Sequence, residues 1–324
     1  MASVIRIVQT GGPEVMTMEE LSDQTPGPGE VWLKQEAVGV NFLDVTQRNG
    51  AVPIPLPSGL GYEAAGRVNA VGPGVINVSI GDRVAYATGP IGAYASGRIF
   101  PAERLVRLPD DVSYDEAAGV LFKGITAQYL LKSVYPVGPG KVVLLYAASG
   151  ALGQIMARWA KHLGAAVIGV VSSDAREYAA RSAGCDAVVV WGCSDMTAEV
   201  SKFTGGKKVD VVYDSIGRTT FAASLDSLRP RGMLVSFGAA SGAPAAVEVG
   251  TLNAKGSLFL TRPSIFAYTA DSGEYRDRAA DVLAALAAGT IKPAVWQTFS
   301  LAQAAEAHAA LEGRKSHGAI VLKP

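Results

Sequence analysis

Residues 141–171, KVVLLYAASGALGQIMARWAKHLGAAVIGVV, decide the fold of this chain. The apolar run 141–146 is of strand type, and the small-residue loop 147–153 follows it. Residues 154–163 predict a helix with Ile155, Trp159 and Leu163 on one face. Gly164 ends that helix, and the run 166–171 predicts a second buried strand. The stretch therefore predicts a βαβ unit.

The loop between the first strand and the helix suits a pyrophosphate. The first backbone N–H groups of a helix are free and carry the positive end of its dipole. Gly150 would let the backbone approach the ligand, in a turn that could need unusual backbone angles, and Gly153 would let the helix pack close to the strand. Ala148 stands where G-x-G-x-x-G has its first glycine, so the motif is incomplete. The candidate pyrophosphate contacts are Ser149, Gly150, Ala151 and Leu152.

Composition narrows the class of protein. The chain has 324 residues, 49% of them hydrophobic and 18% charged, which is enough for a sizeable core and about two domains. The 29 basic and 29 acidic residues balance, so charge gives no reason to expect nucleic acid or an anionic membrane as partner. No stretch is apolar enough to be a signal peptide core or to span a bilayer. Cys185 and Cys193 are too few for a disulfide framework, so we expect a reduced, cytoplasmic enzyme.

The first ~120 residues are predicted to be β-rich, because turn signals are dense there. A strand is expected at Glu30–Val40 and another one ending near Tyr86. Short strands of this spacing are typical of a barrel-like domain. A helix is expected to begin near residue 112, with Ser113 as its N-cap.

Residues 126–262 alternate regularly between strand and helix, which predicts a doubly wound parallel sheet. After the central unit we expect helices at 174–183, 194–203 and 218–228, and strands at 187–190, 209–213, 233–237 and 257–260. The tail predicts a helix at 275–288, a strand at 294–299, a helix at 301–311 and a strand at 319–322.

Seven stretches, spread over nearly the whole chain, carry a family resemblance through their sequences and their order. They are Gly39-Val-Asn-Phe-Leu-Asp44, Leu56-Pro-Ser-Gly-Leu-Gly-Tyr-Glu-Ala-Ala-Gly66, Phe122-Lys-Gly-Ile-Thr126, residues 147–153, Val212-Tyr-Asp-Ser-Ile-Gly217, Val235-Ser-Phe-Gly238 and Leu260-Thr-Arg-Pro263. With them the chain resembles the quinone oxidoreductases of the zeta-crystallin type, in the zinc-independent branch of the medium-chain dehydrogenase/reductase superfamily. The resemblance implies a GroES-like catalytic domain of residues 1–125 and 264–324, with a Rossmann nucleotide-binding domain of residues 126–263 inserted in it.

The choice between NAD and NADP depends on the end of the second strand. An acidic side chain there would accept hydrogen bonds from the ribose 2′-OH and repel a 2′-phosphate. The chain has Ser172, Ser173 and Arg176 there, which suit a phosphate. Asp174 is interpreted as the N-cap of the following helix, so NADPH is the predicted cofactor. The resemblance adds Trp191, in place of a tyrosine, and Arg314 to the 2′-phosphate site.

The resemblance also implies which residues face the nicotinamide end of the cofactor. For each residue the alternative is a polar loop residue or a hydrogen-bonded core residue. Asn41, Asp44, Lys123 and Thr126 would face the nicotinamide, and Ser215, Phe237, Gly238 and Arg262 would line the groove.

A catalytic zinc site is not expected. Zinc needs thiolate and imidazole ligands, and Tyr62 stands where the zinc branch has the histidine of Gly-His-Glu. Position 41 is asparagine, and the three histidines, at 162, 308 and 317, are scattered, which favours surface or packing roles over metal ligation.

No general acid is evident in the sequence either. Hydride transfer to an acceptor with its own electron-withdrawing carbonyls needs little beyond orientation, which favours a quinone over a simple ketone. Tyr62 is a candidate catalytic hydroxyl beside Asn41 and Asp44, or an aromatic lining the cleft. The physiological acceptor, and whether electrons leave singly or as a hydride, stay open.

We therefore predict an NADPH-dependent quinone oxidoreductase. One alternative is an NADPH-dependent reductase of enal or enone C=C bonds. A non-enzymatic alternative is an NADPH-dependent RNA-binding or crystallin-like protein, and the balanced charge disfavours RNA. The strand at 257–260 would be the edge of the nucleotide sheet, and pairing it with its own copy predicts a homodimer.

Overall fold

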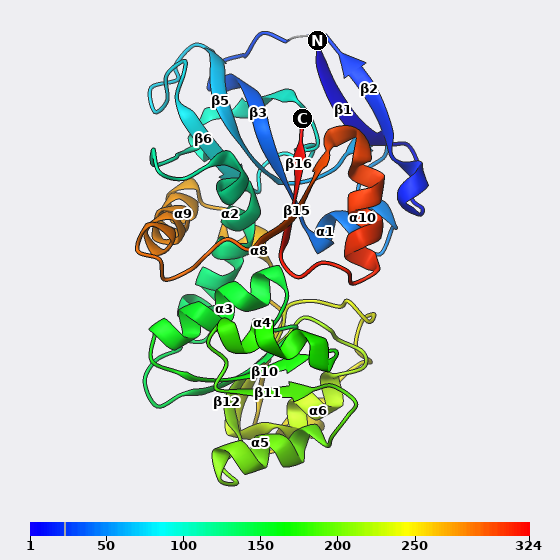
Figure 1. Ribbon diagram of the computed structural model, residues 1–324, viewed down its shortest axis with the longest axis vertical. Coiled ribbons are helices and arrows are strands. Elements are labelled where there is room, and N and C mark those ends of the chain that lie inside the picture. Colours follow the sequence, from blue (N-terminus) through cyan, green and yellow to red (C-terminus); the bar gives the residue numbers. More distant parts are fainter. Residues whose placement is uncertain (23) are drawn as a thin grey trace. The chain divides into compact units, whose positions relative to one another are not determined.

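The computed structural model describes residues 1–22 and 24–324 and divides into two compact units. The β-rich unit comprises residues 1–125, 269–288 and 293–324, and the α/β unit comprises residues 126–268 and 289–292. Figure 1 shows both units.

The α/β unit contains a six-stranded sheet in the order β11-β10-β9-β12-β13-β14, in which all neighbours are parallel. Strand order reverses between β9 and β12, which is where doubly wound folds bind their ligands. The predicted Rossmann-type sheet is therefore confirmed. Its strands are β9 (Val142–Tyr146), β10 (Ala166–Val171), β11 (Ala187–Val190), β12 (Val209–Asp214), β13 (Leu228–Ser236) and β14 (Phe259–Thr261).

Helices cover both faces of this sheet, α3 and α4 on one and α5 and α6 on the other (Figure 1). Of the three residues predicted to form the apolar face of α3, Ile155 and Trp159 are 3% and 2% exposed, and Leu163 is half-buried at the C-cap. The helices are α3 (Ala151–His162), α4 (Glu177–Ser182), α5 (Met196–Thr204), α6 (Phe221–Asp226), α7 (Val249–Ala254) and α8 (Ile265–Tyr268), and a π-helical turn spans Leu130–Val134.

In the β-rich unit the C-terminal tail completes a sheet that the N-terminal part begins. The seven-stranded sheet contains the path β15-β16-β3-β5-β6-β8, with β7 paired to β3, and a three-stranded sheet has the order β2-β1-β4. Strand β16 pairs antiparallel with β3, so the α/β unit is an insertion in the chain of this barrel-like fold. The strands are β1 (Ala2–Ile7), β2 (Thr17–Leu21), β3 (Glu30–Val40), β4 (Ser58–Gly59), β5 (Glu63–Val71), β6 (Arg83–Ala87), β7 (Gly97–Pro101), β8 (Val106–Arg107), β15 (Val295–Ser300) and β16 (Ala319–Lys323).

Helix α2 (Tyr114–Tyr129) begins where the sequence predicted, since Ser113 Oγ accepts the Glu116 N–H at 3.2 Å. Helix α1 (Phe42–Arg48) was not predicted. It begins with a capping box of Asn41 and Asp44, which the spacing N-x-x-D could have indicated. Helix α10 (Ala304–Glu312) lies beside α1 (Figure 1), and α9 (Ser272–Ala287) completes the unit.

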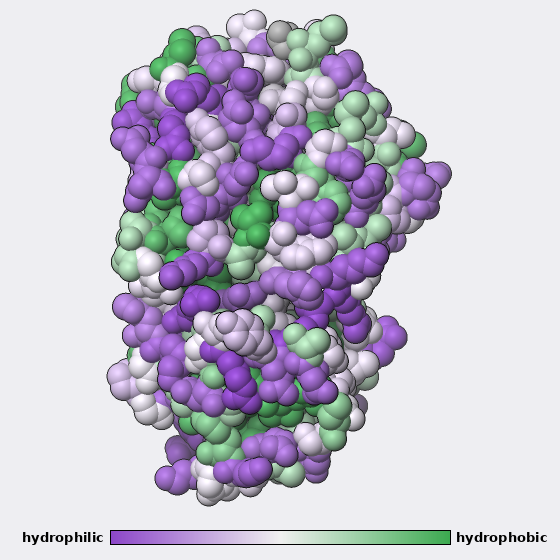
Figure 2. Space-filling view, viewed as in Figure 1, coloured by the Kyte–Doolittle hydropathy of each residue, from purple (hydrophilic) through white to green (hydrophobic). Residues whose placement is uncertain are grey.

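On the face shown in Figure 2, hydrophilic side chains predominate and hydrophobic ones form small patches between them. Within residues 1–22 and 24–324, no helix is both long enough and apolar enough to cross a bilayer.

Candidate functional site

The small-residue loop at 147–153, called the glycine loop below, leaves the N-terminus of α3 without a capping side chain. Gly150 is the N-cap residue, and no side chain caps the helix there. The first N–H groups of α3 thus have no intrahelical acceptor and are available to an anion. An added Cβ at Gly150 would meet just Ala147 O, at 3.3 Å, so this residue keeps the surface beside those N–H groups low. Ser149 is buried, and Ala151 and Leu152 are half-buried.

The expectation of unusual backbone angles at Gly150 is wrong. Its φ of −77° and ψ of 170° are open to any residue, and the positive φ of this loop, 52°, belongs to Ala147. The close packing predicted at Gly153 is present, because an added Cβ there would lie 2.1 Å from Ala147 O. The fold therefore constrains Gly153 far more strongly than Gly150, where an added Cβ would lie 3.3 Å from the same oxygen.

At the end of β10 the structure places Ser172 and Ser173 exposed and Arg176 half-buried. The interpretation of Asp174 as a helix N-cap is wrong. Ser173 holds the N-cap position of a 3₁₀ turn at Asp174–Arg176, closed by the Arg176 N–H bonded to Ser173 O at 3.0 Å, and α4 begins at Glu177. Asp174 is thus an exposed residue of this turn.

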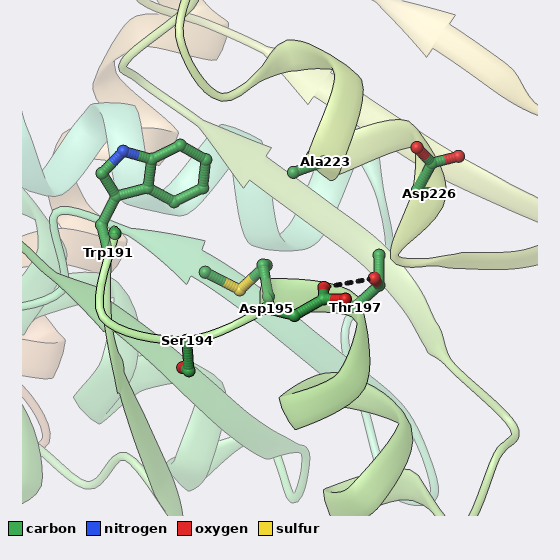
Figure 3. Close-up of a pocket in the computed structure, with 8 residues that line it drawn as sticks. Trp191, Ser194, Asp195, Thr197, Ala223 and Asp226 are labelled. Atoms are coloured by element: carbon green, nitrogen blue, oxygen red, sulfur yellow. Dashed lines mark hydrogen bonds between the residues drawn. The ribbon is translucent and has the colours of Figure 1, made fainter.

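Trp191 follows β11 and lines a pocket of about 380 Å³. Figure 3 shows its indole at one side of the pocket and the Asp226 carboxylate at another. Asp195, which also lines the pocket, caps α5 and accepts the Thr197 hydroxyl at 2.6 Å. The lining residues are Trp191, Gly192, Ser194, Asp195, Met196, Thr197, Ala223 and Asp226. None of these lining residues belongs to the loop at 147–153, so this pocket does not show where a dinucleotide would bind.

The loops after β12 and β13 contact each other, and the groove that Ser215, Phe237, Gly238 and Arg262 would line stays a prediction. An added Cβ at Gly238 would lie 2.5 Å from Ser215 O, so these backbones are in contact. Phe237 N–H donates to Asp214 O at 3.0 Å. Arg262, which is exposed, lies within 3.3 Å of Ser236 Oγ through its Nη1.

Asp214 organises this region and was missed at the sequence level. The side chain is fully buried at the end of β12. Its carboxylate accepts hydrogen bonds from the backbone N–H groups of Ile216 and Gly217 and from the hydroxyls of Thr220 and Ser224. An acidic residue directly after the run Val211-Val-Tyr213, at the end of a strand, was the available signal.

In the β-rich unit, Glu63 holds two predicted site residues together. Its carboxylate is 0% exposed, and Oε2 accepts the Asn41 amide at 3.0 Å and pairs with Lys123 Nζ at 3.3 Å. Oε1 accepts the Phe122 N–H at 2.6 Å, which ties the cluster to α2. Glu63 belongs to one of the stretches that carry the family resemblance, but the sequence predicted no role for it. Thr126, one helical turn after Lys123, is buried too.

Asp44 and Tyr62 lie in the same unit with different partners. Asp44 Oδ2 accepts the Asn41 N–H at 2.8 Å and the Tyr94 hydroxyl at 3.0 Å. Burial raises the pKa of Asp44 to about 7. The Tyr62 hydroxyl accepts the Gln47 amide at 3.0 Å, and burial raises the pKa of Tyr62 above its usual value.

The remaining predicted residues are more dispersed. Arg314 is exposed in the turn after α10, in the β-rich unit, whereas Arg176 belongs to the α/β unit. His162 and His317 are exposed, and His308 is fully buried 2.8 Å from the Tyr94 hydroxyl. In the part of the chain that the structure describes, no group of three His, Cys, Asp or Glu side chains is placed to hold a metal ion.

The chain matches two family models, the alcohol dehydrogenase GroES-like domain at residues 27–110 and the zinc-binding dehydrogenase model at residues 151–285. A 2-haloacrylate reductase of a Burkholderia species is 44% identical, covering 100% of this chain and 99% of that protein. A quinone oxidoreductase of Pseudomonas aeruginosa is also 44% identical, over 100% of both chains. The solved structure of Escherichia coli quinone oxidoreductase complexed with NADPH is 41% identical, with a TM-score of 0.97 over 99% of this chain and 100% of that one.

The fold, the open N-terminus of α3 and the identity to these relatives over full length agree with one another. The chain belongs to the quinone oxidoreductase family of the medium-chain dehydrogenase/reductase superfamily.

Proposed function

We propose that this protein is an NADPH-dependent quinone oxidoreductase that transfers electrons to its acceptor without a metal. The observation that carries the cofactor assignment is the uncapped start of α3 on a loop of small residues, followed at the next strand end by Ser172, Ser173 and Arg176. The helix N-terminus suits a pyrophosphate, and two hydroxyls with a guanidinium suit a 2′-phosphate. The relative from Escherichia coli is solved with NADPH, which supports the same assignment.

In this proposal one domain binds the nucleotide and the other carries the catalytic residues. Residues 126–263 would form the nucleotide-binding domain, and residues 1–125 and 264–324 the catalytic domain. When bound, NADPH supplies the hydride. Glu63 fixes the amide of Asn41 and the ammonium of Lys123, so both groups are oriented before a ligand arrives. A quinone carries its own electron-withdrawing carbonyls, so orientation is the main requirement.

A second candidate is the reduction of a conjugated C=C bond. It is favoured by the 44% identity to a 2-haloacrylate reductase over the full chain. Both reactions deliver a hydride to an electron-poor carbon framework and then need one proton, so the same side chains would serve either.

Steady-state oxidation of NADPH against a panel of quinones, enones and 2-haloacrylates distinguishes the candidates. We expect the highest kcat/KM with quinones, and unchanged rates after dialysis against a strong chelator. Higher kcat/KM for enones or haloacrylates would assign the second candidate. If no compound of the panel supports oxidation of NADPH, both candidate functions are refuted.

We also propose a cytoplasmic homodimer. Cys185 and Cys193 are both unpaired, which suits a reducing compartment. Within the described residues β14 is the end strand of its sheet, and Phe259 on it is 57% exposed. Pairing β14 with its own copy across a two-fold axis would cover this edge.

The dimer proposal predicts the mass of two chains at micromolar concentration, measured by sedimentation equilibrium. Phe259→Asp should shift the mass toward one chain, while Ile76→Asp, at a surface residue of the β-rich unit that is 95% exposed, should not. A wild-type protein with the mass of one chain would contradict the proposal.

A further inference from the structure

A row of basic side chains crosses the seven-stranded sheet of the β-rich unit. Strands β3, β5 and β6 are antiparallel neighbours (Figure 1), and their registers place Lys34 opposite Arg67 and Arg67 opposite Arg83. Lys34 and Arg67 are exposed, and Arg83 is half-buried. Residues directly opposite each other on antiparallel strands lie on the same face, and like charges in such positions destabilise a sheet. This row therefore costs stability unless an opposite charge offsets it.

The row leads into a pocket of about 320 Å³, called the arginine pocket below. Arg67 on β5 and Arg83 on β6 line this pocket, and a third arginine, Arg107, comes from β8, which pairs with β6. Three neighbouring strands thus each supply one guanidinium to the same cavity. The lining residues are Arg67, Gly81, Asp82, Arg83, Arg107, Leu108 and Asp110.

Two aspartates also line the arginine pocket, and they differ in their partners. Asp82 Oδ2 lies 3.1 Å from Arg107 Nη2 and accepts the Ser79 N–H at 2.9 Å, so its charge is offset within the fold. Asp110 is exposed, and its carboxylate has no ion pair among the described residues. Three arginines against two aspartates leave one positive charge in excess. The arginine pocket therefore favours an anion over a neutral or cationic ligand.

The guanidinium groups of this pocket are held by the fold in different ways. Arg83 Nη1 and Nη2 donate to backbone carbonyls of the loop at 109–112, and its guanidinium lies 4.8 Å from the centroid of the Tyr114 ring. Arg67 Nη1 donates to Gly81 O at 2.7 Å, and its other N–H groups have no acceptor among the described residues. Arg83 thus contributes a fixed charge, whereas Arg67 contributes both a charge and donors that a ligand can use.

We propose that the arginine pocket binds a phosphate group, either of a soluble phosphate compound or of a lipid headgroup. A guanidinium matches phosphate because its parallel N–H groups bond two of the oxygens at once. The tetrahedral dianion presents further oxygens to a second arginine, so Arg67 and Arg107 would bind it from two strands. Its charge would offset the repulsion within the row. Neither this site nor its test depends on the reduction of a quinone.

Isothermal titration of inorganic phosphate at constant ionic strength tests the proposal. The protein is saturated with NADP⁺, so that a 2′-phosphate site on the cofactor surface is already filled. Two charge-assisted contacts predict a Kd on the order of 1 mM. Arg67→Gln should weaken phosphate binding about tenfold, as expected for a lost hydrogen bond to a charged group. Arg67→Lys should restore part of the affinity, and Asp110→Asn should strengthen binding because it removes a repulsive carboxylate.

Vesicles identify the source of the phosphate group. Ile80, which precedes Gly81 of the pocket lining, is 65% exposed, and Ile76 in the same loop is 95% exposed, so both would enter a lipid surface. Cosedimentation with phosphatidic acid vesicles that is lost in Arg67→Gln and in Ile80→Asp would assign a lipid headgroup. Binding of inorganic phosphate without cosedimentation would assign a soluble phosphate compound.

Arg6→Gln is the matched control for the titrations. Arg6 lies on β1 of the same unit, 3.7 Å from Glu19 through its Nε, and does not line the arginine pocket. Phosphate affinity in Arg6→Gln should equal that of the wild type. Equal weakening in Arg6→Gln and Arg67→Gln, or no saturable binding at tens of millimolar phosphate, would overturn the proposal. Acetate bound as tightly as phosphate would overturn the assignment of the ligand.

Discussion

The candidate site residues of the two units are built in opposite ways. In the α/β unit, the site consists of backbone N–H groups at the start of α3 and of exposed or half-buried side chains at the end of β10. In the β-rich unit, it consists of the buried side chains of Glu63, Lys123 and Asp44, which are bonded to one another or to neighbours. A backbone site depends on small residues and tolerates changes of side chain around it, whereas a buried charge cluster fails when one member is removed.

The largest effect is expected in the buried cluster. Glu63→Gln leaves the Lys123 ammonium buried without its partner carboxylate, which should cost about 3–5 kcal/mol of unfolding free energy. Denaturant titration measures the loss. The double variant Glu63→Gln, Lys123→Met removes both charges and should recover a large part of it. A single variant as stable as the wild type would mean that this pair does not hold the cluster together.

The glycine loop should separate folding from binding. Gly153→Ala places a Cβ 2.1 Å from Ala147 O and should cost about 3 kcal/mol through overpacking. Gly150→Val occupies open backbone angles, so the melting temperature should fall by only a few degrees, about 1 kcal/mol for a domain of this size.

For NADPH binding we expect the opposite order, with the larger loss in Gly150→Val and the smaller one in Gly153→Ala. NADPH fluorescence titration should show affinity collapsing in Gly150→Val, because the branched side chain stands beside the open N–H groups of α3. Near-normal NADPH binding by folded Gly150→Val would place the dinucleotide elsewhere in the protein. It would also remove the contrast between a glycine kept for the fold and one kept for the ligand.

A smaller effect is expected at the end of β10. Arg176→Ala should weaken NADPH by about 1–3 kcal/mol and leave NADH nearly unchanged, because the guanidinium would contact only the 2′-phosphate. Since Asp174 is exposed in the same turn, Asp174→Asn should strengthen NADPH slightly by removing a repulsive charge. Isothermal titration with both cofactors measures these changes, and equal weakening of NADH by Arg176→Ala would contradict the assignment.

The mildest test uses the pH dependence of stability in the β-rich unit. The pKa of His308 is lowered from 6.5 to about 3. The contribution of this imidazole to the free energy of unfolding is therefore complete above pH 6.5 and is lost as pH falls toward 3. The pKa of Asp44 is raised from 3.8 to about 7, so its contribution is complete below pH 3.8 and is lost as pH rises through 7.

Replacing His308 should reveal its part of this pH dependence of stability. Between pH 6 and 4 the stability of His308→Gln relative to wild type should improve by about 1.4 kcal/mol for each unit that pH falls. Urea titrations at several pH values measure the slope. Parallel curves for wild type and His308→Gln would show that the imidazole is not buried as a neutral group.

The sequence alone determined the order of strands and helices in the α/β unit and its nucleotide-binding loop. Strands β10 and β11 lie at the predicted residues, because short apolar runs between glycine-rich turns are local signals. The packing role of Gly153 was predicted correctly, because the close contact of helix and strand is made within the loop at 147–153. The interpretations of Gly150 and Asp174 failed at the level of one backbone angle and one turn type, which local patterns do not specify.

Only the tertiary structure decided the buried network of the β-rich unit. Asn41, Asp44 and Lys123 were named from family resemblance, and their partners Glu63 and Tyr94 lie between 22 and 60 positions away along the chain. His308, which contacts Tyr94, is 214 positions from it. Hydrogen bonds between such distant side chains leave no periodic pattern in a sequence. Whether a carboxylate is solvated or buried beside a tyrosine is set when β16 closes the sheet against β3 and α10 packs beside α1. The chemistry of Asp44 is therefore a property of the folded chain, because burial and not residue type moves its pKa.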